Sequence, residues 1–384
     1  MNVSNDTLNK LIAFRKYLHK HPELSKKEHE TAKKIKEFLS TNPPDKIIEG
    51  LGKTGLAAIY YGKKSGKTIL IRGDIDALPI AETNSFEHAS VNQNVSHKCG
   101  HDGHTTILAG LSVILNEKPI ESGRVVLLFQ PAEETGEGAA QVLSDPKFNA
   151  LNPDYAFALH NLPGFDLNKV VIKEKHFAAA SKGMIIRLTG KTSHAANPEH
   201  GISPALAVAE IIQKFHALSA TKEIFKDFKL ITLIHTRIGE VAFGTTPGYA
   251  VVMATLRSYR NDDMELLTQE AISIIEEISD KYALSEKIEF REEFPATVNN
   301  EFCVKTIREV CAENDLSIIE TLEPFRWSED FGHFTAKYPG AMFGIGAGKK
   351  HPALHNPEYD FPDQIINTGI IIFEGIIRKL LSSV

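Results

Sequence analysis

Five potential metal donors lie within eight residues of this 384-residue chain, and they constrain its fold more than any other feature. The segment from Val95 to Thr105 reads VSHKCGHDGHT. It supplies a thiol, three imidazoles and a carboxylate, side chains that hold divalent metals of borderline softness. A single histidine is usually an ordinary core or surface residue. Five donors this close together, with glycines at 100 and 103 that allow a tight backbone, instead predict that the fold brings this segment to a metal site.

Length and composition indicate a two-domain protein without a nucleic-acid or membrane partner. A chain of 384 residues exceeds what one hydrophobic core usually supports. The net charge of −6 and a pI near 6.3 give no basic surface for nucleic acid or anionic lipid. The sequence has no apolar leader segment and no apolar run long enough to span a membrane. Three cysteines are too few for a disulfide framework, so we expect a cytoplasmic protein.

The hydrophobic pattern predicts an α/β protein with a smaller inserted domain. Continuous apolar runs typical of buried strands recur in the outer parts of the chain, at 56–61, 68–72, 124–129, 154–159 and 341–345. The middle differs, with strands and helices in the βαββαβ order of a ferredoxin-like unit: 183–189, 202–219, 230–238, 249–257, 263–282 and 287–293. We predict a doubly wound catalytic domain from residues 1–181 and 295–384, with a lid domain at 182–294.

Acidic and imidazole side chains follow four of the strands predicted in the outer parts of the chain. They are, in chain order, Asp74, Asp76, Glu133, Glu134, His160 and His355. Ligands of open α/β sheets collect outside the carboxyl ends of the strands. An acidic pair in a loop is usually only solvated, but four such placements at one edge of a sheet predict a functional site there.

Five of the candidate side chains can act as metal ligands: Cys99, His101, Glu134, His160 and His355. Five ligands are too many for one tetrahedral zinc ion, but they suit two divalent ions that share a bridging group. One glutamate of the 133/134 pair is then free to act as general base on a metal-bound water, whose pKa falls toward ~7. The predicted reaction class is metal-assisted hydrolysis. Thiolate favours zinc and carboxylates also accept manganese, with cobalt and nickel as further candidates.

Seven motifs follow one another in the order of a known family: RGDIDALP (72–79), CGHDGH (99–104), QPAEETGEGA (130–139), ALHNLPG (158–164), GKTSHAANP (190–198), SEDFG (328–332) and LHNPEYDFPD (354–363). The chain resembles the amidohydrolase branch of the aminoacylase/carboxypeptidase metallopeptidases. That branch includes N-acyl-amino-acid amidohydrolases, hippurate hydrolases, indoleacetyl-amino-acid hydrolases and N-acetyldiaminopimelate deacetylases. The resemblance extends from about Leu11 to the end of the chain.

The resemblance implies the amide bond of an N-acyl amino acid as the substrate, cleaved by metal-bound hydroxide. It implies that the five ligands named above hold two metal ions, that Glu133 is the general base and that Asp76 orients a ligand. It further implies that His194 of the lid stabilises the oxyanion, and that the lid forms a homodimer. Asp74 stands where related peptidases outside this branch carry a ligand histidine, and it is either functional or a turn-forming residue.

Several alternatives stay open at the level of the sequence. Without the resemblance, His194 is best interpreted as a turn histidine. Arg257 either binds a substrate carboxylate bidentately or is a solvated strand end. Trp327 either lines the substrate pocket or belongs to the core. A dipeptidase or carboxypeptidase on the same scaffold is the alternative enzyme. A metal-binding protein without activity is the alternative from another class, although a structural site needs no spare base.

Overall fold

The computed structural model describes residues 3–382, which divide into two compact units. The first unit extends to Phe177 and also includes Thr297–Glu323 and the chain from Asp330 onward. The second unit consists of Ala178–Ala296 and Pro324–Glu329. The sequence prediction assigned residues 324–329 to the catalytic domain. They belong to the second unit because Phe325 forms a β-bridge with Ala178 and accepts the backbone N–H of Ala179 at 3.0 Å.

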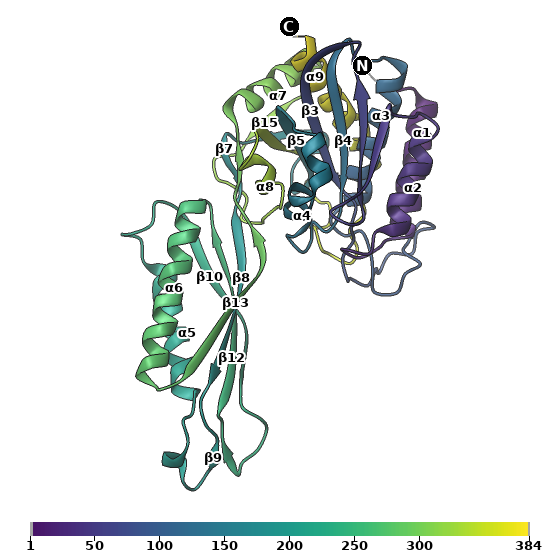
Figure 1. The fold of residues 1–384 in the computed structure, drawn as a ribbon. Coiled ribbons are helices and arrows are strands. Elements are labelled where there is room, and N and C mark those ends of the chain that lie inside the picture. The colour runs from purple at the N-terminus through teal and green to yellow at the C-terminus, as the bar shows by residue number, and fades with distance from the viewer. Residues whose placement is uncertain (1–2, 383–384) are drawn as a thin grey trace. The chain divides into compact units, whose positions relative to one another are not determined.

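The first unit is built on an eight-stranded mixed sheet with the order β1-β2-β4-β3-β5-β16-β6-β15 (Figure 1). Its strands are β1 (Lys46–Leu51), β2 (Gly55–Tyr61), β3 (Lys64–Asp74), β4 (Ser122–Gln130), β5 (Tyr155–Pro163), β6 (Val170–Ile172), β15 (Ile318–Glu320) and β16 (Gly340–Gly348). The central strands β4, β3, β5 and β16 are mutually parallel and almost entirely buried, which explains their continuous apolar runs. Their carboxyl ends therefore meet at one edge of the sheet.

Two groups of helices cover this sheet. One face packs against α1 (Asn5–Lys20), α2 (His29–Leu39), α3 (His101–Glu117), α7 (Glu301–Glu313) and α9 (Ile366–Ser382), whose apolar side chains form one continuous core with alternate residues of the central strands. The short helices α4 (Gly138–Ser144) and α8 (Gly332–Thr335) contact the sheet through β4 and β16. Cys303 and Cys311 lie on α7 with fully buried thiols, as expected of small core residues.

The second unit is a four-stranded antiparallel sheet with helices on one face (Figure 1). Its main elements are, in chain order, β8 (Ala180–Thr189), α5 (Ala205–Ala220), β10 (Lys229–Ile238), β12 (Tyr249–Ser258), α6 (Asn261–Lys281) and β13 (Ser285–Phe294). Val252, Ala254 and Leu256 of β12 are buried, whereas the alternate residues of the strand are partly exposed. This period of two is typical of a sheet covered on one side only. The architecture confirms the predicted α/β fold with a βαββαβ unit inserted in the chain.

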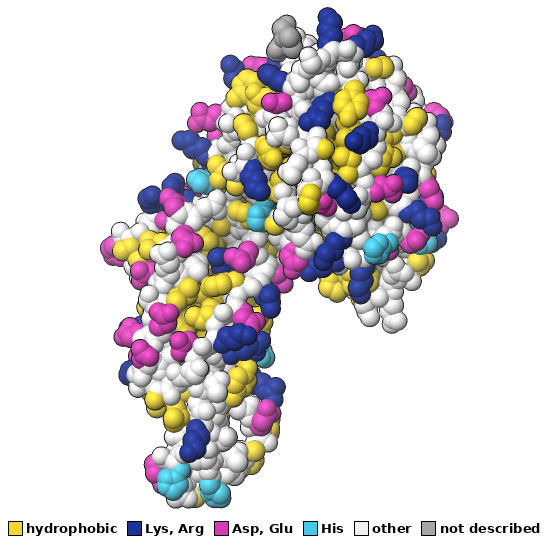
Figure 2. Space-filling model, in the orientation of Figure 1, with side chains coloured by type: hydrophobic (Ala, Val, Ile, Leu, Met, Phe, Trp, Pro, Cys, Tyr) yellow, Lys and Arg dark blue, Asp and Glu magenta, His cyan; other side chains and the backbone are white. Residues whose placement is uncertain are grey.

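Surface charge is mixed on the face of the molecule drawn in Figure 2. Lys and Arg side chains alternate there with Asp and Glu side chains over both units, so no continuous basic stripe lies on this face. Among the described residues, no helix has an apolar stretch that is long enough to cross a bilayer.

Candidate metal centre

The predicted ligands converge at the carboxyl ends of the parallel strands of the first unit. Cys99 and His101 lie at the start of α3, Glu134 follows β4, His160 lies on β5 and His355 follows β16. Their donor atoms form two trios in which all atoms lie within 4.8 Å of one another. One trio is Cys99, His101 and His160, and the other is Cys99, Glu134 and His355. Cys99 belongs to both trios, so its sulfur would be a donor common to the two groups if each held an ion.

Gly100 allows Cys99 and His101 to share the site. It is the N-cap of α3 and has a φ of +92°, a left-handed conformation that favours glycine. A Cβ at this position would lie 2.5 Å from Oδ1 of Asn161, so any larger residue would clash. The chain therefore turns sharply after Cys99, and α3 begins directly at His101. The sulfur of Cys99 lies 3.5 Å from Nε2 of His160.

Asp76 fixes the ring of His101. Nδ1 of His101 lies 3.0 Å from the backbone oxygen of Asp76 and 3.2 Å from its carboxylate, so Nδ1 donates a proton there. Nε2 then faces the centre, where it is buried and has no hydrogen-bond partner among the described residues. The same carboxylate accepts the hydroxyl of Ser25 at 2.7 Å and the backbone N–H of Glu134 at 3.0 Å. Asp76 thus orients two predicted ligands at once.

Adjacent glutamates make different contacts. One oxygen of Glu134 lies 3.6 Å from Nε2 of His355, and the other is buried without a hydrogen-bond partner, 3.7 Å from Nε2 of His101. Glu133 instead accepts the backbone N–H of Asp330 at 3.4 Å, while its second oxygen lies 3.9 Å from Nε2 of His101. Ala132 has a φ of +54°, which turns the chain just before this pair. The two carboxylates can therefore perform different tasks.

The electrostatics of the centre favour a bound cation. Burial alone would lower the pKa of His101, but the carboxylates of Asp74, Asp76 and Glu134 raise it to about 10. Burial raises the pKa of Glu134, and Asp76 and Asp74 raise it further, against the influence of His101. The negative charge of these carboxylates thus favours a cation at the centre. The unpartnered nitrogen of His101 and oxygen of Glu134 point to the same conclusion, and thiolate, imidazole and carboxylate are suitable donors for zinc or manganese.

A buried ion-pair network lies beneath the centre, and the sequence did not reveal it. Arg72 is 1% exposed and forms ion pairs with Asp74 at 2.6 Å and with Asp330 at 2.7 Å. Asp74 is fully buried and also pairs with Nδ1 of His104 at 2.6 Å, so it is not a solvated loop carboxylate. The backbone N–H of Asp330 also contacts Glu133. The ion pairs of Arg72 are therefore connected, through Asp330, to the predicted general base. The motifs RGD and SEDFG were the only signal in the sequence.

Three further candidates belong to the second unit. His194 lies on β9 (Ser193–His194), is exposed, and its Nδ1 accepts the backbone N–H of Ala196 at 3.1 Å. The neutral ring therefore carries its proton on Nε2. Arg257 is partly buried on β12 and donates to the backbone oxygen of Arg326 at 2.9 Å and to the hydroxyl of Ser328 at 3.0 Å. Trp327 is partly buried and stacks on Phe325, with ring centroids 5.0 Å apart. Their roles toward a substrate stay predictions.

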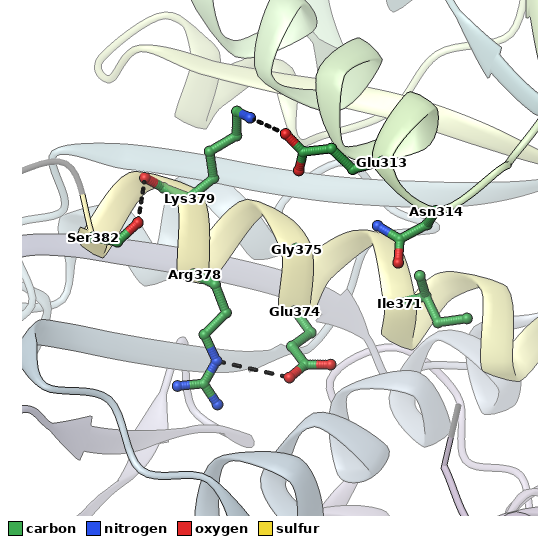
Figure 3. A pocket seen from close by; sticks show the side chains of 8 residues that line it. All are labelled: Glu313, Asn314, Ile371, Glu374, Gly375, Arg378, Lys379 and Ser382. Carbon is green, nitrogen blue, oxygen red and sulfur yellow. Dashed lines mark hydrogen bonds and ion pairs between the residues drawn. The ribbon is translucent and has the colours of Figure 1, made fainter. Parts of the chain in front are cut away.

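A pocket of about 390 Å³ between α7 and α9 is separate from the metal centre (Figure 3). Its charges already pair with one another, Lys379 with Glu313 and Arg378 with Glu374. The last turn of α9 lies beside the amino end of β4, because Ser122 donates to the backbone oxygen of Leu381 at 2.7 Å. The pocket therefore lies at the edge of the sheet opposite to the predicted ligands.

Comparison with known proteins identifies the family of the chain and relatives along its whole length. The model of peptidase family M20/M25/M40 matches residues 70–379. N-acetyl-L-cysteine deacetylase of Bacillus subtilis (strain 168) is 30% identical over 99% of this chain and 91% of its own length. An uncharacterized hydrolase of Staphylococcus aureus (strain bovine RF122 / ET3-1) is 32% identical over 95% of this chain and 96% of its own. The crystal structure of the Bacillus subtilis YXEP protein, described as a dinuclear metal-binding peptidase of the M20 family, matches with a TM-score of 0.85 and 26% identity over 100% of both chains.

Proposed function

The chain belongs to peptidase family M20/M25/M40, as its motifs predicted, and on that premise we propose that it hydrolyses the amide bond of N-acyl amino acids with two divalent metal ions. The observation that carries this proposal is that Cys99 belongs to two donor trios. Glu133 belongs to neither of these two trios, although its carboxylate forms a further group with His101 and Glu134. Five donors suit two ions that share a bridge, and a spare carboxylate suits hydrolysis.

Each side chain has a task in this proposal. Bound divalent ions supply Lewis acidity, which lowers the pKa of a coordinated water and polarises the substrate carbonyl. Glu133 takes the proton of the attacking water and later gives it to the leaving nitrogen. The backbone N–H of Asp330 donates to one oxygen of Glu133, and the other oxygen lies 3.9 Å from Nε2 of His101 at the centre. His194, from its own or a partner subunit, donates Nε2–H to the oxyanion.

The name of one relative supports the proposed substrate class. One of them is named as a deacetylase of N-acetyl-L-cysteine, a small N-acyl amino acid with a free carboxylate. We therefore propose N-acetyl, N-benzoyl and indoleacetyl amino acids as the substrates to test, with zinc or manganese as the metal and cobalt or nickel as further candidates. A dipeptidase or carboxypeptidase is the alternative, because its substrates share the amide and the carboxylate. The homodimer through the second unit and the cytoplasmic location also remain proposals.

Removal and return of metal tests the function. We expect chelation to abolish amide hydrolysis, and reconstitution with zinc, manganese, cobalt or nickel to restore release of free amino acid from the acylated substrates. Two bound ions per chain are expected by elemental analysis. A preference for plain dipeptides would move the assignment to a peptidase. Two bound ions without turnover of any substrate would support the binding protein without activity.

Arg257→Lys tests recognition of the substrate carboxylate. A guanidinium binds a carboxylate with two parallel hydrogen bonds, which a lysine cannot reproduce. We expect KM to rise roughly 10- to 100-fold with little change in kcat, matching about 1.5–3 kcal/mol for charge-assisted hydrogen bonds. Carboxyl-amidated substrates should show no such rise. Arg260→Lys is the control, since Arg260 pairs with Asp262 at the surface of the same unit. An unchanged KM in Arg257→Lys would leave Arg257 as a structural strand-end residue.

A further inference from the structure

We propose that Lys98 is a positioning residue that fixes the spacing of Cys99 and His355, and thereby sets the affinity of one of the two metal positions. The inference rests on the proposed metal centre. Cys99 and His355 are donors of the same trio, the one completed by Glu134, although 256 residues separate them in the sequence. Lys98 directly precedes Cys99 in the sequence.

The side chain of Lys98 is fully buried. Its ammonium group donates to the carboxylate of Glu82 at 2.5 Å and to the backbone oxygen of Tyr359 at 2.7 Å. Burial of an ammonium group is costly unless the group is paired and hydrogen-bonded. A neutral side chain would fill this space without the cost of burying a charge. The hydrogen bonds to Glu82 and Tyr359 are therefore the reason for a lysine at this position.

Lys98 holds the segment of His355 at two points. The backbone oxygen of Lys98 accepts the backbone N–H of His355 at 2.8 Å. Its side chain bonds the backbone oxygen of Tyr359, four residues further along. The first contact fixes the ligand itself, and the second prevents the rest of the loop from rotating about it. The two ligand segments are therefore joined through one residue.

The conformation of His355 requires such a restraint. Its φ is +64°, a left-handed conformation that costs free energy in any residue other than glycine and persists only when the surroundings enforce it. Packing contributes little, because 52% of the His355 side chain is exposed. The bond from the backbone N–H of His355 to Lys98 acts on this residue itself, and the bond from the Lys98 ammonium group to Tyr359 adds to the other contacts that hold the loop after it.

Glu82 is anchored independently of Lys98. Its carboxylate also accepts Nε2 of His19 at 3.0 Å and the backbone N–H of Ser90 at 2.6 Å. Burial alone would lower the pKa of His19, but Asp102 and Glu82 raise it to about 9. Removal of the lysine charge therefore leaves Glu82 with a protonated partner at neutral pH. The fold should tolerate the loss of the ammonium group.

Lys98→Met is the direct test, because methionine keeps the apolar stem and removes the ammonium group. We expect one ion to bind as in the wild type, and the second to bind about 10- to 100-fold more weakly, the usual effect of losing a partner that orients a ligand. Titration of the apoprotein with Co²⁺, followed by the absorption of the cobalt–thiolate, measures both affinities without turnover. Turnover should fall at limiting metal and recover in excess metal, which a general loss of structure would not allow.

Two more variants make the test decisive. Arg124→Met removes a partly buried cation of β4 that bonds Thr68 and the backbone oxygens of Ala150 and Leu151, so it should lower stability without changing either affinity. Glu82→Gln keeps the lysine contact to Tyr359, and we expect a smaller loss of affinity than in Lys98→Met. It also serves as the readout if Lys98→Met does not fold, since an unchanged second affinity would then contradict the proposal.

The outcomes separate this inference from the proposed function. Wild-type affinities for both ions in Lys98→Met, or an equal loss at both positions, would overturn the role of Lys98. A wild-type protein that binds fewer than two ions would overturn the proposed metal centre, and the role of Lys98 with it. Because the wild type is titrated first, the two failures cannot be confused.

Discussion

Glu133→Gln should lower kcat by about 100- to 10,000-fold, the usual contribution of a general base, while two metal ions remain bound. Glutamine has the shape of glutamate and can still accept the backbone N–H of Asp330 through its amide oxygen. It cannot take a proton from water. Glu133 belongs to neither of the Cys99 trios, so both of these trios keep all their donors in this variant. Steady-state kinetics together with elemental analysis of the same preparation measures both effects.

The same substitution at two neighbouring glutamates provides the controls for this result. Glu134→Gln should lower metal content as well as activity, because Glu134 completes the trio of Cys99 and His355. Glu137→Gln should change neither property, since this partly exposed side chain pairs with Lys26 at the surface. If Glu133→Gln lost metal while Glu134→Gln kept it, the two glutamates would exchange roles.

Two kinds of pattern pointed to the predicted ligands: the density of donors around Cys99 and His101, and the place of the others at the carboxyl ends of parallel strands. Buried parallel strands have continuous apolar runs, and their carboxyl ends share an edge, so the placement of Glu134 and His160 follows from pattern alone. The βαββαβ order of the second unit could likewise be predicted, from its alternating and helical periods. Short elements such as β6 and β15 carry too few residues to show a period.

Partners that support the ligands could not be predicted. Arg72 and Asp330 are 258 residues apart, and no local pattern indicates that an arginine within an apolar strand will bind that carboxylate. The burial of Lys98 could not be predicted either, because a charged residue in a loop is usually exposed. The place of residues 324–329 in the second unit could not be predicted for the same reason, since it depends on contacts of Phe325 with Ala178 and Ala179, which are far away in the sequence. Pairing of distant segments is a property of the folded chain.

The first helix also supports the centre, although the match to the family model begins only at residue 70. Asp102 directly follows the ligand His101 and is buried. From α1, Arg15 pairs with it at 3.1 Å and His19 at 2.9 Å. Both cations also contact Asp360, in the segment that follows His355. Helix α1 thus contacts the segments of two predicted ligands, His101 and His355. These contacts explain why Arg15 and His19 are buried on the inner face of the helix.

Cys99→Ala should remove both metal ions and therefore abolish activity. Each trio loses a donor in this variant, and the remaining pairs, His101 with His160 and Glu134 with His355, are too few to hold an ion tightly. The loss of affinity should exceed the roughly 10- to 100-fold typical of an outer partner. Metal content after dialysis and titration with Co²⁺ measure the effect, and the cobalt–thiolate absorption should disappear.

The other cysteines provide matched controls for this change. Cys303 and Cys311 are fully buried on α7, and burial raises the pKa of both thiols to about 12, so they stay protonated and cannot replace Cys99 as a ligand. Their alanine variants should lower stability through the small cavity left in the core, with metal content unchanged. If Cys99→Ala kept one ion at wild-type affinity, the thiol would serve one position only. The bridge between the two trios would then need another donor, and Asp74, which lies 3.6 Å from Nε2 of His101, would be the next carboxylate to replace.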